Sequence, residues 1–502
     1  GQGAHREPVL TSGPSPKPAA ATVDIEPHLL VLFGATGDLA KRKLIPALYS
    51  LMKRRNFDDT TRVLGVATSQ LEDDDYRDMA REALVESGVD EEEASSWCAE
   101  IISYQSIKAG FDELAQRIDN IESAAGLPGN RAFYLAIPPS VFDDTIEGLA
   151  SVGLDTSSGW TRVVVEKPFG VDFESARQLN ELLHRWFDES QIYRIDHYLA
   201  KETVQNILVF RFANPLFESS WNRDRIDSVE ITVAETLGLE GRAGYFDRAG
   251  MIRDVVQNHV FQVMALMAME PPVRLDARAI RDEKVKVLRS IYPMTKDGVV
   301  RGQYAAGSYD GDTVPGYRDE DGIDGDSSTE TYAALRVCID NWRWRGVPFY
   351  LRAGKRMPER LTQVVVRFKR PPVYLFDGEG ACRVHANVMY ITLQPDEGFD
   401  LHFDVKTPGE GMELRPQSLS FRYGDVFDDL PDAYETLIVD FLAGDQTLFV
   451  RGDEAEEAWR ILGPVIDIGA EPELYQAGTW GPEAADGLIT GDGDHWHPQQ
   501  DH

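Results

Sequence analysis

The stretch RIDHYLAKE (194–202) brings a carboxylate, an imidazole, a phenol and an ammonium group close together in the chain. If this stretch forms a helix, His197 and Lys201 share one face and Tyr198 lies beside Lys201. An aromatic ring with two possible cations is the composition expected of a phosphate pocket. Asp196 points elsewhere on such a helix and is free for a different task. The alternative is a solvated helix with a chance ion pair.

A second set of reactive groups lies in the segment IRDVVQNH (252–259), which is followed by apolar residues to Met269. A lone histidine such as His259, at the polar end of a buried run, is more often a hydrogen-bonded core residue than a catalyst. Asp254 and Glu235 lie nearby in sequence and supply the carboxylates that a tuned general base needs. His259 is therefore a candidate general base.

Lysine is rare in this chain, which makes the positions of the lysines informative. Of the 51 Lys and Arg residues, 13 are lysine. Where lysine is so scarce, a lysine inside a motif is more significant than a lysine elsewhere on the surface. The lysines that fall in motif-like positions are Lys43, Lys167, Lys201 and Lys355.

Two of these lysines stand next to turn residues. Lys167 stands in EKPFG (166–170), at the end of an expected strand, where ligands bind to open parallel sheets. A lysine there can reach both a cofactor and a substrate, although a Pro-Gly turn with a surface lysine is the alternative. Lys355 ends the segment 346–355, which taken alone predicts a basic loop, and Arg360 follows it.

A glycine turn near the N-terminus predicts a dinucleotide site. The apolar run 28–33 leads into the sequence GATGDLA (34–40). Gly34 and Gly37 let the backbone approach a pyrophosphate, and the helix that follows offers free N–H groups and a positive dipole end. A Gly-x-x-Gly pair alone is weak evidence, because turns use glycine for their own reasons. Its position between a strand and a helix strengthens the prediction.

The elements that must position these residues follow two patterns. Strands are expected at 28–33, 62–67, 131–137 and 162–166, with helices at 39–51 and 71–88. This alternation predicts an α/β, Rossmann-like, doubly wound domain over 27–200. After about residue 205 the pattern changes, with strands expected at 226–235, 331–340, 363–370 and 386–394 and helices at 251–269 and 432–442. A large α+β domain with a mostly antiparallel sheet is therefore expected over 201–490.

Three segments are not expected to form regular structure. Residues 305–328 are rich in glycine and aspartate and predict a loop. Residues 1–26 are rich in proline and alanine, and residues 491–502 are polar, so both are expected to be disordered tails.

Composition restricts the partners and the compartment. The net charge of −33 argues against nucleic acid and anionic membranes as partners, and no apolar run is long enough for a membrane span. Cys98, Cys338 and Cys382 are far apart, show no metal spacing and fit a reducing cytoplasm, and no signal-peptide pattern is seen. The acidic, lysine-poor composition predicts adaptation to concentrated salt, and arginine codon bias in a GC-rich genome is the alternative.

Seven ordered blocks of the chain, within about 28–485, resemble the glucose-6-phosphate dehydrogenase family. Among them, RIDHYLAKE is the most specific. The blocks are GATGDLAKRKL (34–44), RAFYLAIPP (131–139), EKPFG (166–170), RIDHYLAKE (194–202), GYFDRAGMIRDVVQNH (244–259), NWRWRGVPFYLRAGKR (341–356) and AGTWGPEAAD (477–486).

The resemblance implies a reaction and roles for particular residues. The reaction is oxidation of glucose 6-phosphate at C1 to 6-phosphoglucono-δ-lactone, with hydride passing to NAD or NADP, in a homodimer or homotetramer without a metal. His259 would be the base that removes the C1 hydroxyl proton, and Asp196 would orient it. The residues implied to bind substrate are Lys167, His197, Tyr198, Lys201, Glu235, Asp254, Lys355 and Arg360. Those implied to bind the cofactor are Gly34, Thr36, Gly37, Asp38, Leu39, Lys43, Thr68, Tyr134 and Lys167.

The chain departs from the family pattern at a position that matters for the cofactor. The family usually has an arginine just after the second strand, where it clamps the 2′-phosphate of NADP, and this chain has Thr68 there. Loss of the guanidinium removes a charge-assisted contact, and Glu72 and Asp73 are close enough in sequence to repel a 2′-phosphate. No acidic residue stands at position 68 itself, so both NAD and NADP remain open.

Two other functions compete with this interpretation. An oxidoreductase of the glucose–fructose oxidoreductase type also has a Rossmann domain, a Glu-Lys-Pro motif and an α+β domain, but it lacks RIDHYLAKE and the block that ends in His259. A non-catalytic paralogue that binds a sugar phosphate or a partner is the other alternative. Because every catalytic position is intact, an enzyme is the favoured interpretation.

Overall fold

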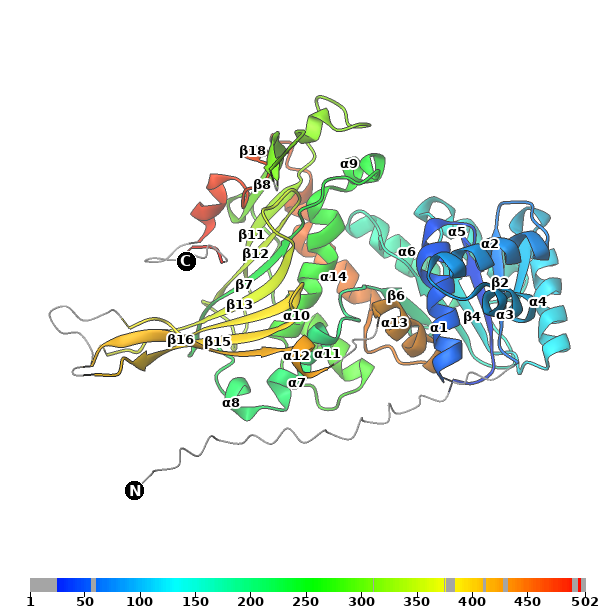
Figure 1. Ribbon diagram of the computed structural model, residues 1–502, viewed down its shortest axis with the longest axis horizontal. Coiled ribbons are helices and arrows are strands. Elements are labelled where there is room, and N and C mark those ends of the chain that lie inside the picture. Colours follow the sequence, from blue (N-terminus) through cyan, green and yellow to red (C-terminus); the bar gives the residue numbers. More distant parts are fainter. Residues whose placement is uncertain are drawn as a thin grey trace, which may run out of the picture.

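The computed structural model contains two large β-sheets with helices between and around them (Figure 1). It describes residues 25–55, 60–309, 311–373, 375, 384–409, 412–427, 432–489 and 495–497. Most of the expected N-terminal tail, residues 1–24, and Cys382 lie outside the described residues.

The first sheet is a doubly wound sheet of seven strands in the order β17-β6-β5-β4-β1-β2-β3, and all of them except β17 are parallel. Its parallel strands are β1 (Leu29–Phe33), β2 (Arg62–Ala67), β3 (Ile102–Ser106), β4 (Arg131–Leu135), β5 (Thr161–Val165) and β6 (Ile192–Ile195). The strands are buried, with all five residues of β1 inaccessible, as expected when helices cover both faces of a parallel sheet. The predicted strands in this domain are confirmed, whereas β3 and β6 were not predicted.

Helices cover this sheet and connect its strands. They are η1 (Ala40–Leu44) with α1 (Ile45–Arg55), α2 (Asp73–Glu86), α3 (Glu91–Ile101), α4 (Phe111–Ala125), α5 (Phe142–Ser151) and α6 (Phe173–Trp186). Local sequence fixes several of their ends. The Asp172 carboxylate accepts the N–H of Ser175 at 2.8 Å where α6 begins, and Gly126 ends α4 in the left-handed conformation.

The second sheet has nine strands in the order β16-β15-β14-β13-β7-β12-β11-β8-β18 and is mostly antiparallel, as predicted. Its strands are β7 (Ile226–Ala234), β8 (Val299–Ala305), β11 (Tyr332–Cys338), β12 (Pro348–Gly354), β13 (Leu361–Phe368), β14 (Val388–Gln394), β15 (Gly398–Lys406), β16 (Leu414–Arg422) and β18 (Glu473–Gln476). Two neighbouring pairs, β7 with β12 and β8 with β18, are parallel.

Helices between the two sheets join them into one molecule. These include α7 (Glu202–Phe212), α9 (Ala243–Met251), the π-helical segment η5 (Ile252–Val260), α10 (Phe261–Ala268), α11 (Ala277–Arg289), α13 (Ala433–Ala443) and α14 (Gly452–Ile466). Figure 1 shows α10 and α14 between the large sheet and the first domain. The short strand β17 (Phe449–Val450) comes from the second half of the chain and extends the first sheet antiparallel to β6.

Three segments expected to be irregular contain regular or buried structure. The segment 346–355 is not a basic loop, because Pro348–Gly354 forms β12 between β7 and β11 with a largely buried face. The expected loop 305–328 contains the paired short strands β9 (Gly307–Tyr309) and β10 (Asp312–Val314). Within the expected C-terminal tail, Trp496 is 1% exposed and its indole N–H donates to the carbonyl of Ala485 at 2.9 Å.

Candidate active site

A cavity of about 490 Å³ lies where the two parts of the molecule meet, and it collects most of the predicted site residues. Residues from both sheets and from η5 line it. The lining includes Lys167, Tyr198, Lys201, Glu235, Arg242, Asp254, His259, Lys355, Arg360 and Gln394. The cavity therefore combines several cations with carboxylates and one imidazole, a composition suited to a polar, phosphorylated ligand.

The imidazole of His259 is paired with the carboxylate of Asp196. Asp196 follows β6, His259 lies in η5, and the distance from Nδ1 to Oδ1 is 2.6 Å. Because a carboxylate can only accept, Nδ1 carries the proton of the neutral imidazole and Nε2 is left as an acceptor. Both residues are buried, with 1% of Asp196 and 7% of His259 exposed. The expectation that Asp196 serves a different task from its neighbours in RIDHYLAKE agrees with this contact.

The pKa values of this pair follow from burial and from the contact. Burial lowers the pKa of His259 below its ordinary value of 6.5, and the charge of Asp196 opposes part of that effect. Burial alone would raise the pKa of Asp196, but the charge and hydrogen bond of His259 and the N–H of Tyr198 hold this pKa below its ordinary range. At neutral pH the imidazole is therefore neutral and able to accept a proton.

Lys167 lies on the accepting side of the imidazole. It follows β5, and its Nζ lies 3.2 Å from His259 Nε2, 3.2 Å from the carbonyl oxygen of Asp254 and 3.3 Å from the Asp254 carboxylate. A ligand hydroxyl that reaches Nε2 would take the place of this amine. Lys167 therefore marks the position at which a proton would be transferred.

A local break in the helix gives His259 its place. Gly250 has φ +68° between α9 and η5, and a Cβ there would collide with the carboxylate of Glu330. The same carboxylate accepts the N–H of Ile252 at 3.1 Å and so begins η5. The ring of Tyr198 then stacks on His259 with centroids 4.2 Å apart, which fixes the plane of the imidazole.

The expected helix over RIDHYLAKE is wrong. β6 ends at Ile195, residues 197–200 form turns, and α7 begins at Glu202. The Asp196 carboxylate accepts the N–H of Tyr198 at 2.9 Å, a local bond that competes with helix formation. The turn nevertheless places Lys201 Nζ over the ring of Tyr198, 4.5 Å from its centroid.

Lys201 and Arg360 form a cationic corner of the cavity. Both approach Gln394, whose Oε1 lies 2.6 Å from Lys201 Nζ and 3.4 Å from Arg360 Nη2. Burial lowers the pKa of Lys201, and the nearby Arg360 adds to this effect. Gln394 was not predicted, because a single glutamine at the end of β14 carries no sequence signal without the strand pairing of β13 with β14.

Glu235 and Lys355 form an ion pair at the end of two parallel strands. The Lys355 Nζ to Glu235 Oε2 distance is 2.6 Å. The two residues follow β7 and β12, where Ala234 pairs with Gly354, so strand register alone brings them together. A sugar hydroxyl can bind either member of such a pair.

His197 lies apart from the other predicted substrate residues. Its Nε2 is 3.4 Å from Glu166 Oε2 and 3.2 Å from the hydroxyl of Tyr434, and its Nδ1 is buried without a hydrogen-bond partner among the described residues. Its predicted role in binding phosphate remains a prediction.

The glycine turn after β1 has the geometry that a dinucleotide requires. Gly34 has φ +75°, and a Cβ there would collide with the carbonyl oxygen of Ala136. Gly37 N donates to the carbonyl of Gly34 at 2.9 Å, which closes the turn before Asp38 and Leu39 and leaves Gly37 exposed. The backbone here could approach a pyrophosphate closely, so these residues fit a dinucleotide cofactor.

The other predicted cofactor residues do not all lie in this turn. Thr36 lies in the turn, and the buried Tyr134 of β4 donates its hydroxyl to Glu166 Oε1 at 2.6 Å. Lys43 lies on η1 and lines a different cavity of about 470 Å³ with Arg42 and Glu435. Thr68 is exposed directly after β2.

A polar cavity of about 710 Å³ lies beyond the carboxyl ends of β2 and β3, where the adenosine half of a dinucleotide binds in such sheets. It contains two arginines, each held by an aspartate. Arg117 Nη2 lies 2.6 Å from Asp73 Oδ2, and Arg77 Nη1 lies 3.0 Å from Asp74 Oδ1. Neither guanidinium is therefore an uncompensated cation.

Neither a metal-binding cluster nor a membrane-spanning helix is present among the described residues. They contain no group of three or more His, Cys, Asp or Glu side chains placed to hold a metal ion. Within the same ranges, no helix has the length and apolar character needed to cross a membrane.

Comparison with known proteins assigns both halves of the chain to one family. Residues 31–206 match "Glucose-6-phosphate dehydrogenase, NAD binding domain" and residues 208–497 match "Glucose-6-phosphate dehydrogenase, C-terminal domain". Similar relatives are named glucose-6-phosphate 1-dehydrogenase. The protein from Aggregatibacter actinomycetemcomitans is 46% identical over 93% of this chain and 96% of its own length, and that from Treponema pallidum is 44% identical over 94% and 95%.

Solved structures agree with this assignment. A glucose-6-phosphate dehydrogenase in complex with glucose 6-phosphate has a TM-score of 0.85 and 37% identity, covering 93% of this chain and 97% of that chain. The glucose-6-phosphate 1-dehydrogenase from Mycobacterium avium has a TM-score of 0.80 and 38% identity, covering 94% and 98%.

Proposed function

The chain belongs to the glucose-6-phosphate dehydrogenase family, and we propose that it oxidises D-glucose 6-phosphate to 6-phosphoglucono-1,5-lactone with transfer of hydride to NAD or NADP. This reaction is the first step of the oxidative pentose phosphate pathway. The observation that carries the proposal is the buried Asp196–His259 pair, whose unprotonated Nε2 lies in a cavity that also contains Lys201 and Arg360.

The proton leaves the substrate through His259. Nε2 accepts the proton of the C1 hydroxyl while the C1–H bond breaks and the C1–O bond becomes a carbonyl. Asp196 keeps Nδ1 protonated and stabilises the imidazolium that forms, because the carboxylate is fixed 2.6 Å away. The nicotinamide, when bound, supplies the hydride acceptor.

The cavity orients the substrate through its two ends. Lys201, Arg360 and the Tyr198 hydroxyl would bind the phosphate, because this corner combines two cations with a phenol. Glu235, Asp254 and Lys355 would bind sugar hydroxyls, and Lys167 would contact the reacting end beside Nε2. Burial raises the pKa of Tyr198 to about 12, so its hydroxyl stays a donor at neutral pH.

The enzyme uses NAD at least as well as it uses NADP. The exposed Thr68 offers no charge, and the arginines of the adjacent polar cavity are already paired with Asp73 and Asp74. A 2′-phosphate there would meet Glu72 and Asp73 without a free guanidinium to bind it. A 2′-hydroxyl needs only a hydrogen bond, which Ser69 or Gln70 can supply.

The remaining properties are inferred from family and composition. We expect a homodimer or homotetramer in a salt-adapted cytoplasm, with no nucleic-acid or membrane partner and no metal. The net charge of −33 supports the salt adaptation and the absence of nucleic-acid binding.

A steady-state assay tests the proposed function. The purified chain should reduce both NAD and NADP when glucose 6-phosphate is present, with kcat/KM for NAD at least equal to that for NADP. Unphosphorylated glucose should be a poor substrate, because it leaves the cationic corner empty. Absence of turnover with either dinucleotide would favour the non-catalytic alternative.

A further inference from the structure

The catalytic pair joins two parts of the molecule that have separate sheets. Asp196 follows β6 of the first sheet, whereas His259 belongs to η5, which packs on β7 and β12 of the second sheet. A shift of the two parts by even half an ångström would lengthen the 2.6 Å contact between Nδ1 and Oδ1. Something outside the cavity must therefore fix their relative position.

The helix α14 contacts the segments that carry three of the reacting side chains. The indole N–H of Trp459 donates to the carbonyl of Phe169 at 3.0 Å, in the EKPFG segment that carries Lys167. Ala455 O accepts from the Gln257 side chain of η5 at 3.5 Å, a long bond close to His259. The first turn of α14 contacts Glu189 and Asn180, the two side chains that also bind Arg194 of β6.

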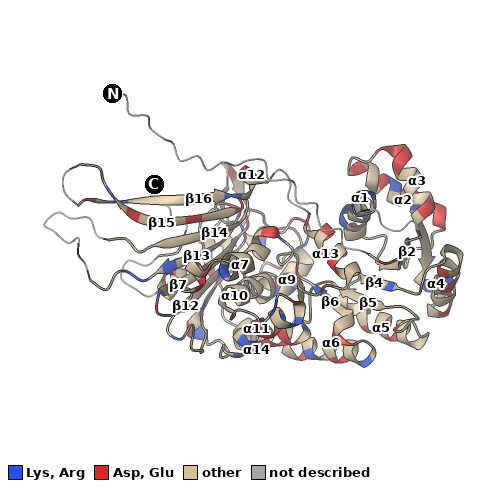
Figure 2. Cartoon of the chain, turned by 90° about the horizontal axis from the view of Figure 1, so that it is seen from below, with Lys and Arg blue, Asp and Glu red and all other residues tan. Residues whose placement is uncertain are grey.

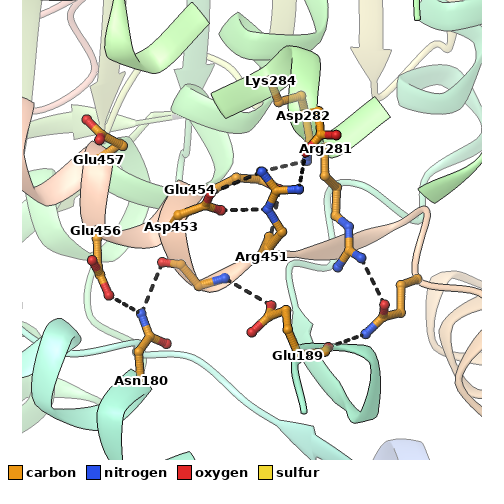
Figure 3. Close-up of polar contacts among 12 residues, drawn as sticks. Asn180, Glu189, Arg281, Asp282, Lys284, Arg451, Asp453, Glu454, Glu456 and Glu457 are labelled. Carbon is orange, nitrogen blue, oxygen red and sulfur yellow. Dashed lines mark hydrogen bonds and ion pairs between the residues drawn. The ribbon is translucent and has the colours of Figure 1, made fainter. Parts of the chain in front are cut away.

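The contact with β6 is made by buried polar side chains. Arg194 of β6, which is fully buried, donates to Glu189 Oε1 at 2.7 Å and to Asn180 Oδ1 at 2.8 Å. The same Glu189 oxygen accepts the N–H of Gly452 at 3.1 Å, and Asn180 donates to the Gly452 carbonyl at 3.1 Å. Gln446, just before β17, donates to the carbonyl of Ile192 at 2.9 Å. Figure 3 shows Asn180 and Glu189 of this group, with the contacts that they make at the start of α14.

The contact with the His259 helix is made by a buried ion pair. Lys284 Nζ of α11 lies 2.7 Å from Glu454 Oε2 of α14, and the two side chains are 1% and 0% exposed. Lys284 also donates to Gln262 Oε1 at 2.8 Å, and Gln262 lies one helical turn after His259 in α10. The other Glu454 oxygen accepts the N–H of Arg451 at 3.2 Å, which begins α14.

We propose that Glu454 and Lys284 are positioning residues for the reaction. They join the helix that carries His259 to the first turn of α14. This turn is itself bound to β6, the strand that precedes Asp196. The inference rests on the proposed function. Two charges buried without water cost free energy that an apolar pair would not, so a purely structural role gives no reason for an ion pair here. The pair has no contact with the cavity and acts only through geometry.

Two variants separate positioning from stability. Glu454→Gln keeps the shape but leaves Lys284 buried without its carboxylate, so thermal stability should fall. The double variant Lys284→Met with Glu454→Leu removes both charges, and its melting temperature should return to within a few degrees of wild type. In both variants kcat should fall about tenfold while KM for glucose 6-phosphate stays within about twofold.

The pH profile gives a readout that stability alone would not change. Asp196 raises the pKa of His259, so a longer contact lowers that pKa and moves the acidic limb of kcat/KM to lower pH. The matched control is Asp282→Asn, which breaks the exposed Arg451–Asp282 ion pair between the same two helices and should change neither kcat nor the limb.

The two possible failures are distinguishable. Wild-type turnover reports on the proposed function alone, and the ratio of variant to wild type reports on positioning. Proton NMR adds a readout that does not need activity: the hydrogen-bonded Nδ1 proton of His259 should resonate far downfield in wild type and move upfield in both variants. A double variant that recovers full kcat, an unmoved acidic limb or an unmoved Nδ1 resonance would overturn the proposal.

Discussion

Individual residues of the cavity account for most of the proposed chemistry. His259 is neutral at neutral pH because burial lowers its pKa, and its unprotonated Nε2 faces the cavity because Asp196 binds Nδ1. Lys201, by contrast, is a partly buried amine whose charge has no carboxylate within ion-pair distance among the described residues, since its short contact is to the amide of Gln394. A dianionic phosphate would complete that corner.

Replacing Lys201 by alanine should therefore weaken binding of the phosphate. A lost charge-assisted hydrogen bond costs about 1.5–3 kcal/mol, so KM for glucose 6-phosphate should rise by roughly ten- to over a hundredfold. Steady-state kinetics with unphosphorylated glucose are the control, because this substrate has no phosphate and its kcat/KM should hardly change. Equal losses with both substrates would show that Lys201 only supports the fold.

Replacing Thr68 by arginine should shift cofactor preference toward NADP. The new guanidinium would follow β2, where the resemblance places the 2′-phosphate clamp, and it should improve kcat/KM for NADP about tenfold or more. Asp73→Asn is a second route, because it frees the guanidinium of Arg117. A wild type that already prefers NADP by more than about a hundredfold would refute the assignment, since another cation, such as Lys43 or Arg42, would then bind that phosphate.

At the scale of elements, strands with continuous apolar runs could be predicted from the sequence. Strands without such a run, such as β3, β9 and β12, could not. The ends of β2 agree with prediction because polar residues, Thr61 and Thr68, bound this largely apolar run. The sequence of β12 predicts a loop because Pro348 and Arg352 hide its strand pattern, whereas in the structure Arg352 is buried between Trp480 and Trp496, each 4.8 Å away. Such long-range stacking leaves no periodic signal in sequence.

Sequence patterns also predict only part of the candidate active site. The family resemblance implies the pairing of Asp196 with His259, whereas the helix expected for RIDHYLAKE does not form because the Asp196 carboxylate accepts the backbone N–H of Tyr198. Gln394 and the Lys284–Glu454 pair depend on tertiary contacts between segments far apart in the chain, so local sequence contains no trace of them.

The C-terminal residues 495–497 should stabilise the second sheet. Trp496→Ala removes a fully buried aromatic ring that stacks on Arg352, a change that costs about 3–5 kcal/mol in protein cores. Differential scanning calorimetry should show a melting temperature several degrees lower. Trp342→Ala is the matched control, since that side chain is 96% exposed and its loss should have little effect. Equal melting temperatures for both variants would mean that Trp496 contributes no stability.

At the scale of the whole molecule, repulsion among carboxylates is the main electrostatic feature. Figure 2 shows acidic residues along the outer helices of the first domain, and the first turns of α2 and α3 each begin with three acidic residues. With a net charge of −33, the folded chain gathers negative charge that the unfolded chain spreads out.

Thermal unfolding should therefore move to higher temperature as KCl rises from about 0.1 M to about 2 M, because the Debye length shortens from about 10 Å to a few ångströms. Sorbitol of equal osmolality is the control for effects other than screening. A melting temperature that stays flat or falls with KCl would favour codon bias as the origin of the composition.

The most direct test of the account is the kcat of His259→Asn with glucose 6-phosphate and NAD. Asparagine keeps a polar group beside Asp196 but cannot accept the C1 hydroxyl proton as imidazole does. We predict that kcat falls by about 10²- to 10⁴-fold while KM for glucose 6-phosphate stays nearly unchanged, the result expected for a group that acts in the transition state. A variant whose kcat remains within about tenfold of wild type would contradict the assignment of His259 as the base.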